Sequence, residues 1–246
     1  MTDAAVRDDL GPVAELVAAR AAGRAGASLV VGLAGGVSVG KSTLAGAVAA
    51  VLAERHGLDT LVVSSDGFLQ PTAVLAEKGL LARKGFPESY DHDAIVAFIA
   101  SIRAGEDELL VPVYDHLFYD VLPDRRVVER TPVVLIEGVN VLHYADHLDL
   151  TVYVDADEPD MRRWYVRRVL ALRDEAASVP GAYLHPFRES SEADVTAMAL
   201  GVWEAINLPN LRESIEPTRA HADVVVVKGP DHEVVEVVEL VGRGRS

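Results

Sequence analysis

Residues 35–42 read Gly-Gly-Val-Ser-Val-Gly-Lys-Ser, and this stretch decides the fold of the chain. A short apolar run at residues 29–33 precedes it, and an Ala/Val/Leu-rich segment at residues 44–55 follows it. A glycine-rich turn that ends in Lys and Ser, between a strand and a helix, is the pattern of a P-loop. Successive backbone N–H groups of such a loop point at phosphate oxygens. The stretch therefore predicts a site that binds the phosphates of a nucleoside triphosphate.

The side chains at the end of this loop have separate tasks. We expect Lys41 to reach the β and γ phosphates of ATP, and Ser42 to offer its hydroxyl to Mg²⁺. The alternative interpretation, a tight turn that binds no ligand, leaves the lysine without a purpose. The nucleotide-binding residues expected in this loop are Gly35, Gly36, Val37, Ser38, Val39, Gly40, Lys41, Ser42 and Thr43.

The rest of the chain alternates between strand and helix patterns. Strands are predicted at residues 29–33, 60–64, 110–113, 132–136, 150–154 and 223–227. Helices are predicted at residues 12–24, 44–55, 91–104, 162–176, 192–206 and from about 231, with loops and short helices over 67–90. This alternation indicates an α/β fold with a doubly wound, mostly parallel sheet, the P-loop kinase fold. We expect a helical extension over residues 1–28 and a single kinase domain over residues 29–246.

Composition excludes several classes of function. The 38 acidic side chains outnumber the 23 basic ones, so a net charge of −15 would repel nucleic acids and acidic membrane surfaces. The sequence has no cysteine, which excludes disulfides and thiolate ligands and is compatible with a reducing cytoplasm. The amino terminus lacks the charge pattern of a secretory signal, and no apolar run approaches the roughly 20 residues of a spanning helix. We expect a cytoplasmic protein without nucleic-acid or membrane partners.

Two acidic residues follow predicted strands. Asp66 comes after the strand at 60–64, and Glu137 ends the apolar run before Gly138. Because the carboxyl ends of parallel strands open on one crevice, both should face the P-loop. Asp66 can then take the proton of an attacking hydroxyl, and Glu137 can hold Mg²⁺ directly or through water. Without the P-loop, Asp66-Gly67 would be only a turn signal.

Two further groups are open to more than one interpretation. The arginines at 162, 163, 167 and 168 share one predicted helix, and most such arginines are solvated or pair with acids. One of them can neutralise charge on a transferring phosphoryl group, although spacing does not choose among the four. Residues 111–120 contain Tyr114, His116 and Tyr119, for which a solvent-facing edge strand with aromatic packing is the ordinary interpretation.

With these residues in place, the sequence resembles the bacterial type I pantothenate kinases of the phosphoribulokinase and uridine kinase superfamily. The resemblance runs from about residue 29 to residue 240. Its densest motifs are Gly32-Leu-Ala-Gly-Gly-Val-Ser-Val-Gly-Lys-Ser-Thr43, Asp66-Gly-Phe-Leu69, Lys84-Gly-Phe-Pro-Glu-Ser-Tyr-Asp91, Pro112-Val-Tyr-Asp-His-Leu-Phe-Tyr-Asp120 and Glu137-Gly-Val-Asn-Val-Leu142. Trp164-Tyr165, Ile206-Asn207 and Pro217-Thr-Arg219 match as well.

The resemblance implies that ATP phosphorylates the primary hydroxyl of pantothenate, the first step of coenzyme A synthesis. It implies Asp66 as the base and Arg168 as the catalytic arginine, beside Lys41. The residues that it implies around pantothenate are Tyr114, His116, Tyr165 and Asn207, with Tyr119 counted among them, and His232 is implied near the adenine. A homodimer, and coenzyme A that competes with ATP, are further implications.

The acceptor region departs from the family pattern. Phenylalanines that line the family's pantothenate tunnel are replaced by Val169, Leu172, Ala177 and Leu184, and Phe187 stands where a tyrosine is usual. About 30 residues precede the P-loop where the family has a long helical segment, and the chain is shorter around residue 145. A rebuilt pocket can serve another small alcohol, such as a nucleoside or a sugar. A nucleotide-binding regulator without turnover is a third hypothesis, against which a base and an arginine at the phosphates argue.

Overall fold

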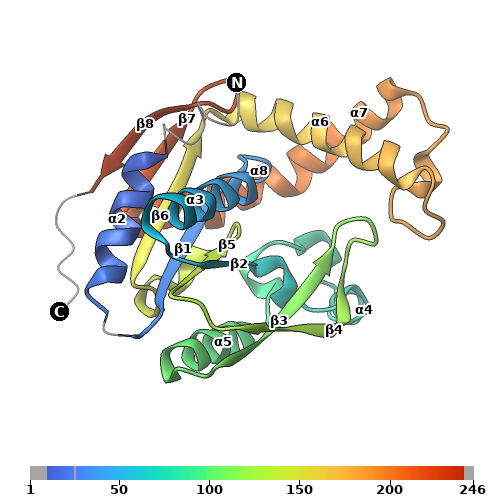
Figure 1. Ribbon diagram of the computed structural model, residues 1–246. Coiled ribbons are helices and arrows are strands. Elements are labelled where there is room, and N and C mark those ends of the chain that lie inside the picture. The colour runs from blue at the N-terminus through green and yellow to red at the C-terminus, as the bar shows by residue number, and fades with distance from the viewer. Residues whose placement is uncertain (1–9, 25, 241–246) are drawn as a thin grey trace.

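The computed structural model describes residues 10–24 and 26–240. In this part of the chain, a six-stranded sheet has the order β2-β5-β1-β6-β7-β8 (Figure 1). Its strands are β1 (Leu29–Gly35), β2 (Thr60–Ser64), β5 (Val133–Glu137), β6 (Leu150–Ala156), β7 (Val224–Lys228) and β8 (Val234–Glu239). Every neighbouring pair is parallel except β7 and β8. The prediction of an α/β fold with a mostly parallel sheet is therefore confirmed.

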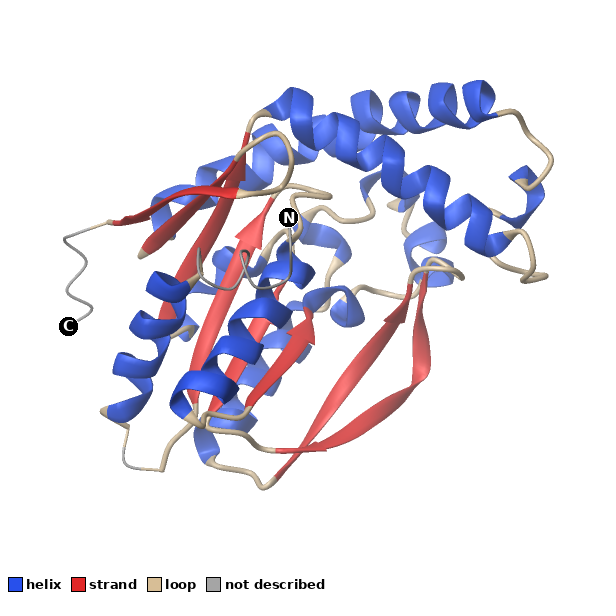
Figure 2. Ribbon diagram, turned by 45° about the horizontal axis from the view of Figure 1, so that its top comes forward, coloured by secondary structure: helices blue, strands red, loops and turns tan. Residues whose placement is uncertain are grey.

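Helices cover both faces of this sheet (Figures 1 and 2). On one face, α2 (Gly11–Ala22) and α3 (Lys41–His56) pack with Val31 and Leu33 of β1. On the other face, α5 (His92–Ala104) and the 3-10 segment η4 (Val141–His147) pack with Val30. Because successive side chains of a strand point to opposite faces, the unbroken apolar run of β1 fills both cores at once.

The carboxyl ends of three neighbouring strands lie level with one another. Glu137 at the end of β5 pairs in register with Leu33 of β1 and with Ser64 at the end of β2. The segments that leave these strands are the P-loop, the 3-10 turn η1 (Ser65–Phe68) and the turn that begins at Gly138. In parallel sheets such strand ends form the ligand site, and all three segments here carry candidate residues.

The carboxyl-terminal half adds long helices beside this edge of the sheet. The helices α6 (Glu158–Ala176) and α7 (Glu192–Val202) pack together around a small apolar cluster and extend beyond the sheet (Figure 1). The helix continues through the π-helical turns η6 (Trp203–Asn207) and η7 (Leu211–Ile215), with α8 (Leu208–Asn210) between them and η8 (Glu216–His221) after them. Pro209 has no backbone N–H to donate, and the wider π turns lie on either side of it. The shorter elements are α4 (Thr72–Glu77), η2 (Leu81–Arg83), η3 (Pro87–Ser89) and η5 (His185–Phe187).

One predicted strand belongs to a separate sheet. The expected strand at 110–113 is part of β3 (Glu108–Asp115), which pairs antiparallel with β4 (Asp120–Glu129) and does not join the main sheet. No strand was predicted at β4, because Asp124, Arg125 and Arg126 interrupt its apolar pattern. Most of this strand is exposed, so it needs little apolar surface.

The prediction of a helix from about residue 231 is wrong. The segment forms β8, an antiparallel edge strand on β7. Its apolar residues are valines that recur with glutamates at a spacing of three, which imitates a helical pattern. Branching at Cβ favours a pleated strand over a helix, and the free edge beside β7 supplies the partner.

Other expectations hold with small shifts or lie outside the described residues. The helix expected at 44–55 begins at Lys41, so the last residues of the P-loop form the first turn of α3. The expected extension at 1–28 includes residues 1–9 and 25, and the expected domain ends at residues 241–246; all of these lie outside the described residues. No helix in the described part of the chain is long and apolar enough to cross a membrane.

Candidate active site

The loop between β1 and α3 has the backbone of an anion-binding nest. The φ angles of Gly35, Ser38 and Gly40 are 151°, 62° and 87°, so the backbone turns repeatedly through positive φ. No side chain among the described residues caps the first turn of α3, whose N–H groups therefore offer donors with the positive end of the helix dipole. The Ser38 hydroxyl is buried and has no hydrogen-bond partner in the described residues. This set of unsatisfied donors fits the phosphates of a nucleotide.

Lys41 is the first residue of α3 and is 8% exposed. Its ammonium donates to the Gly36 carbonyl oxygen at 2.8 Å. Burial lowers the pKa of Lys41, while the carboxylates of Glu137 and Asp66 raise it and the nearby Arg168 lowers it. An ammonium held in a low-dielectric site attracts anions strongly, so Lys41 suits a phosphate ligand.

Ser42 and Glu137 lie together at the carboxyl edge of the sheet. The Ser42 hydroxyl donates to Glu137 Oε1 at 3.0 Å. Burial raises the pKa of Glu137, the nearby Lys41 lowers it, and the charge of Asp66 raises it. Mg²⁺ in nucleotide sites takes one or two oxygen ligands from the protein and the rest from phosphates and water. The two side chains therefore fit a magnesium ion that arrives with a nucleotide.

Asp66 is fixed in η1 directly after β2. Its backbone N–H donates to the Ser64 side-chain oxygen at 3.4 Å, and its Oδ1 accepts from the buried Tyr90 hydroxyl at 3.3 Å. The neighbouring Gly67 lies against β3, because a Cβ there would be 2.5 Å from the Pro112 carbonyl oxygen. Only a residue without a side chain permits this approach, which brings the hairpin to the sheet edge beside Asp66.

The charge of Asp66 acts on two groups of residues. Toward the P-loop, it raises the pKa values of Lys41 and Glu137. This effect is smaller than that of burial and than that of the attraction between these two residues. Toward the hairpin it contributes to the raised pKa of Tyr114, which burial dominates. It also opposes the burial and the Arg168 charge that lower the pKa of His116. Asp66 therefore lies between a phosphate side and a polar-aromatic side.

The arginines at 162, 163, 167 and 168 of α6 have different surroundings. Arg162 and Arg163 form ion pairs with acidic residues at 3.4 and 2.6 Å. Arg167 contributes to the lowered pKa of His232. Arg168 is exposed, has no ion pair within 4.0 Å in the described residues, and acts on the pKa values of Lys41, Tyr114, His116 and Tyr165. Of the four, Arg168 is the arginine whose charge acts on residues on both sides of Asp66.

The hairpin supplies an aromatic group. The Tyr114 ring lies 5.1 Å from the His116 ring and 6.2 Å from the Tyr119 ring, measured between centroids and in edge-on contact. Tyr119 also stacks on Tyr183, from the segment after α6, with centroids 4.8 Å apart. Burial raises the pKa of Tyr119 to about 12, and Tyr165 and Tyr183 contribute. The tyrosines stay protonated at neutral pH and can donate hydrogen bonds.

Tyr165 and Asn207 come from the long helices. Tyr165 of α6 lies with its ring centroid 5.8 Å from that of Trp203. Burial raises the pKa of Tyr165, while the Asn207 amide beside it lowers it. Asn207 ends the π-helical turn η6, and such turns are frequent at functional sites. The structure thus brings Tyr165 and Asn207, which are 42 positions apart in the sequence, next to each other and Tyr165 next to Tyr119.

His232 lies beside the P-loop, next to Gly40. It follows β7, has a φ of 66°, and stacks on Trp164 with ring centroids 3.7 Å apart. A Cβ on Gly40 would lie 3.5 Å from its Nδ1 and 2.9 Å from the Lys228 ammonium. Burial lowers the pKa of His232 to about 4, and Lys228 and the arginines of α6 add to the effect. The ring is neutral at pH 7 and lies beside the loop.

The positions where the family has aromatics are mostly filled by apolar packing. Val169 and Leu184 are buried in the cluster between α6 and α7, and Leu172 and Phe187 pack against it. Ala177 is exposed. The smaller side chains therefore form part of a local core.

Four residues of the site were not predicted from the sequence. Tyr90 bonds Asp66, Tyr183 stacks on Tyr119, Lys228 lies beside Gly40, and Lys84 lies against the hairpin tyrosines. Tyr90 and Lys84 are in the motif at 84–91, which the resemblance marked without giving it a role. Tyr183 carries no local signal, because its position depends on how the segment after α6 folds back.

Known proteins resemble this chain in sequence. The family model of the phosphoribulokinase / uridine kinase family matches residues 30–173. A pantothenate kinase of Rhodopseudomonas palustris is 44% identical over 86% of this chain and 71% of its own length. A pantothenate kinase of Streptomyces coelicolor is 44% identical over 86% of this chain and 69% of its length.

A solved structure supports the fold. The D-glycerate 3-kinase of Cryptococcus neoformans superposes with a TM-score of 0.64 over 94% of this chain and 99% of that one, at 14% identity. Identity at this level speaks for the fold alone, whereas the family model matches more than half of the chain and the curated relatives match 86% of it. The chain belongs to the phosphoribulokinase/uridine kinase family and, within it, to the pantothenate kinases.

Proposed function

We propose that this chain transfers the γ-phosphoryl group of ATP to the primary hydroxyl of pantothenate, the first step of coenzyme A biosynthesis. Relatives at 44% identity bear the name pantothenate kinase. The observation that carries the proposal is the charge of Asp66, which acts on Lys41 at the P-loop and on Tyr114 and His116 of the hairpin. A base at such a junction reaches a phosphoryl donor and an alcohol together.

The chemistry is a direct transfer. The triphosphate supplies the phosphoryl group, and a magnesium ion, when bound, would supply positive charge to it. Asp66 orients the acceptor hydroxyl and takes its proton as the new oxygen–phosphorus bond forms and the bond to the ADP oxygen breaks. Lys41 and Arg168 stabilise the negative charge of the transferring group. Ser42 and Glu137 would hold the magnesium ion that comes with the nucleotide.

The acceptor lies on the polar-aromatic side. Pantothenate carries hydroxyl, amide and carboxylate groups, which need hydrogen-bond donors and acceptors on rigid side chains. The tyrosines supply hydroxyl donors because their pKa values are raised, and the lowered pKa of His116 keeps its ring neutral at pH 7. The proposed acceptor residues are Tyr114, His116, Tyr119, Tyr165 and Asn207. His232, next to Gly40 and stacked on Trp164, is proposed to contact the adenine.

A kinase of another small alcohol is the second candidate. It is favoured by one observation, the packing of Val169 and Leu184 where the family has phenylalanines. An acceptor pocket without those rings loses aromatic contacts with the acceptor and can gain room for a nucleoside or a sugar. The same phosphate side serves either reaction.

A panel of acceptors tests the choice. ADP release would be measured with ATP and Mg²⁺ for pantothenate, pantetheine, uridine, ribulose phosphate and hexoses, with Asp66→Asn as the background. Pantothenate should give the highest kcat/KM, and its product should carry the phosphate on the primary hydroxyl. No turnover of pantothenate, with clear turnover of another alcohol, would overturn the proposal and leave the kinase chemistry intact.

The resemblance also supports three finer proposals: a cytoplasmic location, a homodimer and competition of coenzyme A with ATP. Light scattering at several concentrations would measure the mass, and a monomer at all of them would contradict the dimer. Coenzyme A should raise the KM for ATP without lowering kcat. Inhibition that saturating ATP cannot overcome would contradict competition.

A further inference from the structure

Lys84 is a buried cation at the start of the motif at 84–91. It is 7% exposed and follows η2. Its ammonium donates to Thr72 Oγ1 at 2.9 Å and to the carbonyl oxygen of Tyr119. Its Nζ lies 4.0 Å from the centroid of the Tyr119 ring and 5.3 Å from that of Tyr114. Lys84 therefore holds the hairpin tyrosines by a hydrogen bond to the Tyr119 carbonyl oxygen and by cation–π contacts with the rings of Tyr114 and Tyr119.

No ion pair in the described residues compensates the buried charge of Lys84. No carboxylate among the described residues lies within 4.0 Å of its ammonium. Lysines are almost never fully buried without such a partner, because desolvation of the charge is unfavourable. The sequence has four lysines, and the other two buried ones, Lys41 and Lys228, lie at the P-loop; Lys78 is exposed. Burial of lysine in this chain is confined to the site.

The turn that Lys84 holds has an unusual backbone. Tyr119 has a φ of 55°, the left-handed region that residues with side chains seldom adopt. Its carbonyl oxygen accepts from Lys84 and, at 3.4 Å, from the Thr72 hydroxyl. Asp120, the next residue, accepts from the Thr72 N–H at 2.9 Å. A conformation of this kind persists only when its surroundings over-determine it, and Lys84 is the central donor among them.

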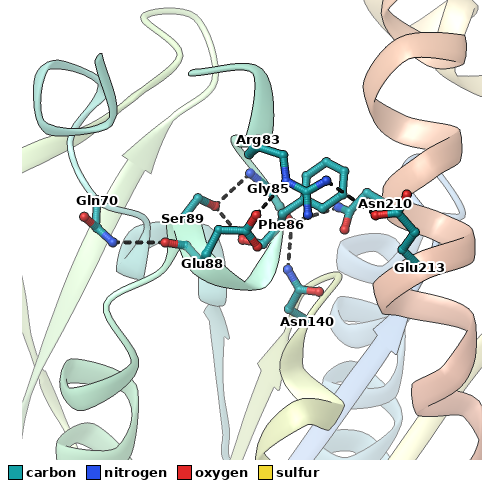
Figure 3. A network of polar contacts seen from close by, with 9 residues as sticks. All are labelled: Gln70, Arg83, Gly85, Phe86, Glu88, Ser89, Asn140, Asn210 and Glu213. Atoms are coloured by element: carbon teal, nitrogen blue, oxygen red, sulfur yellow. Dashed lines mark hydrogen bonds and ion pairs between the residues drawn. The ribbon is translucent and has the colours of Figure 1, made fainter. Parts of the chain in front are cut away.

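The loop that carries Lys84 is anchored to distant parts of the fold, as Figure 3 shows. The Gly85 carbonyl oxygen accepts from Asn140 Nδ2 at 2.7 Å and from Asn210 Nδ2 at 2.8 Å. Arg83 forms an ion pair with Glu88 at 2.6 Å and closes the loop on itself. Asn140 follows β5 and Asn210 belongs to α8, so the main sheet and the long helices both fix the backbone beside Lys84.

We propose that Lys84 is a positioning residue for the acceptor: from this anchored loop, its ammonium fixes the Tyr119 backbone and the rings of Tyr114 and Tyr119 in front of Asp66. The acceptor role of these tyrosines rests on the proposed function. Among the described residues, Lys84 has no hydrogen bond or ring contact with the P-loop: its partners are Thr72, Tyr114 and Tyr119. Its loss therefore weakens acceptor binding and orientation while nucleotide binding stays as it is.

The test separates acceptor binding from nucleotide binding. Lys84→Met keeps most of the side-chain volume and removes the charge, and Lys78→Met is the matched control at an exposed lysine. Lys84→Met should raise the KM for the acceptor about tenfold, with the Kd for ATP, measured by calorimetry, changed less than about twofold. Lys78→Met should change neither. An unchanged acceptor KM in a folded Lys84→Met protein would overturn the proposal.

Two further variants keep the test decisive. Tyr119→Leu and the double variant complete a cycle with Lys84→Met, in which the two changes should be less than additive because they break one arrangement. Additive effects would contradict it. Should Lys84→Met fail to fold, Thr72→Val removes one acceptor of the ammonium and should raise the acceptor KM by a few fold; no change would count against the proposal. All assays use whichever alcohol the panel finds active, so a wrong acceptor and a wrong role for Lys84 give different results.

Discussion

The phosphate side and the acceptor side of this site are built in opposite ways. The phosphate side is built around one contiguous loop, residues 35–42, to which Glu137, Arg168 and Lys228 add single side chains. The acceptor side consists of side chains from β3, the β3–β4 turn, the loop at 83–90, α6 and η6. Most of the phosphate side is therefore encoded by a single stretch of sequence, whereas the acceptor side forms only when five segments come together in the fold.

The two sides also differ in what supports them. The P-loop leaves β1, which is buried along its whole length in the central sheet. The acceptor residues sit on a two-stranded hairpin and on helices that pack around a separate apolar cluster. Elements with few buried contacts open more easily than a central strand. The phosphate side can therefore stay constant across a kinase family while the acceptor side changes to fit another alcohol.

Loss of Lys41 should have the largest effect, because the whole phosphate side depends on it. Lys41→Ala removes the buried ammonium beside the loop, and we expect kcat/KM to fall about 10³-fold, the effect of deleting one preorganised donor or more. The affinity for ATP should fall with it. Calorimetry with ATP and a steady-state assay would measure both, with Lys78→Ala as the control. Normal affinity for ATP in Lys41→Ala would mean that the loop is only a turn.

Asp66→Asn tests the junction between the sides. The amide keeps the size of the side chain and cannot take a proton, so kcat should fall at least about 100-fold while the Kd for ATP stays the same. Single-turnover kinetics and calorimetry would separate the two quantities. Turnover close to that of the unchanged protein would remove Asp66 from the role of base.

The same contrast explains how far the sequence could predict the molecule. The P-loop, the strand before it and the helix after it follow from local chemistry, and so do Asp66 and Glu137, because strand ends of a parallel sheet meet. The choice of Arg168 could not be made from spacing. It depends on which face of α6 meets the P-loop and on the ion pairs that engage Arg162 and Arg163.

The unpredicted parts are those where tertiary contacts override local patterns. β8 repeats valine and glutamate at a helical spacing, and the open edge of β7 makes it a strand. β4 is too polar to be recognised, yet β3 pairs with it along its length. Lys84 and Tyr183 become part of the site only through contacts with Tyr119, which is more than 30 residues away from each in the sequence. Local sequence patterns identify neither the strand with which a segment pairs nor the distant side chain that a residue contacts.

Tyr90→Phe tests whether the buried tyrosine beside Asp66 helps to orient the base. The variant removes the hydroxyl that donates to Asp66 Oδ1 and leaves the ring in place. We expect kcat to fall about three- to tenfold, because one hydrogen bond that orients the base is lost, with the Kd for ATP unchanged. Tyr144→Phe is the matched control, since its hydroxyl contacts His92 in the same core. Equal effects of the two variants on kcat would argue against a specific role for Tyr90.

Lys228→Met should have the smallest effect of the four variants. Unlike the others, which lower activity, it should raise the free energy of unfolding. Burial lowers the pKa of Lys228 from 10.5 to about 8, and the nearby Glu233 opposes this only in part. Below pH 8 the ammonium is charged in both states and its burial is unfavourable. Between pH 8 and 10.5 the unfolded chain binds more protons, so the free energy of unfolding rises with pH. The variant loses this rise and should be more stable at pH 7 by roughly 1–3 kcal/mol.

Urea unfolding without nucleotide at pH 7, 8, 9 and 10 would measure the effect, with Lys78→Met as the control at an exposed lysine. A Lys228→Met protein that is less stable at pH 7, with the same dependence on pH, would show that the ammonium is satisfied in the fold. A more stable protein with a flat dependence would show that the phosphate side holds an unfavourable charge beside Gly40. Burial lowers the pKa of Lys84 as well, so both sides would hold a buried cation at a cost in stability. They would differ in what the ammonium serves, which is a bound anion beside Gly40 and the Tyr119 carbonyl oxygen in the hairpin.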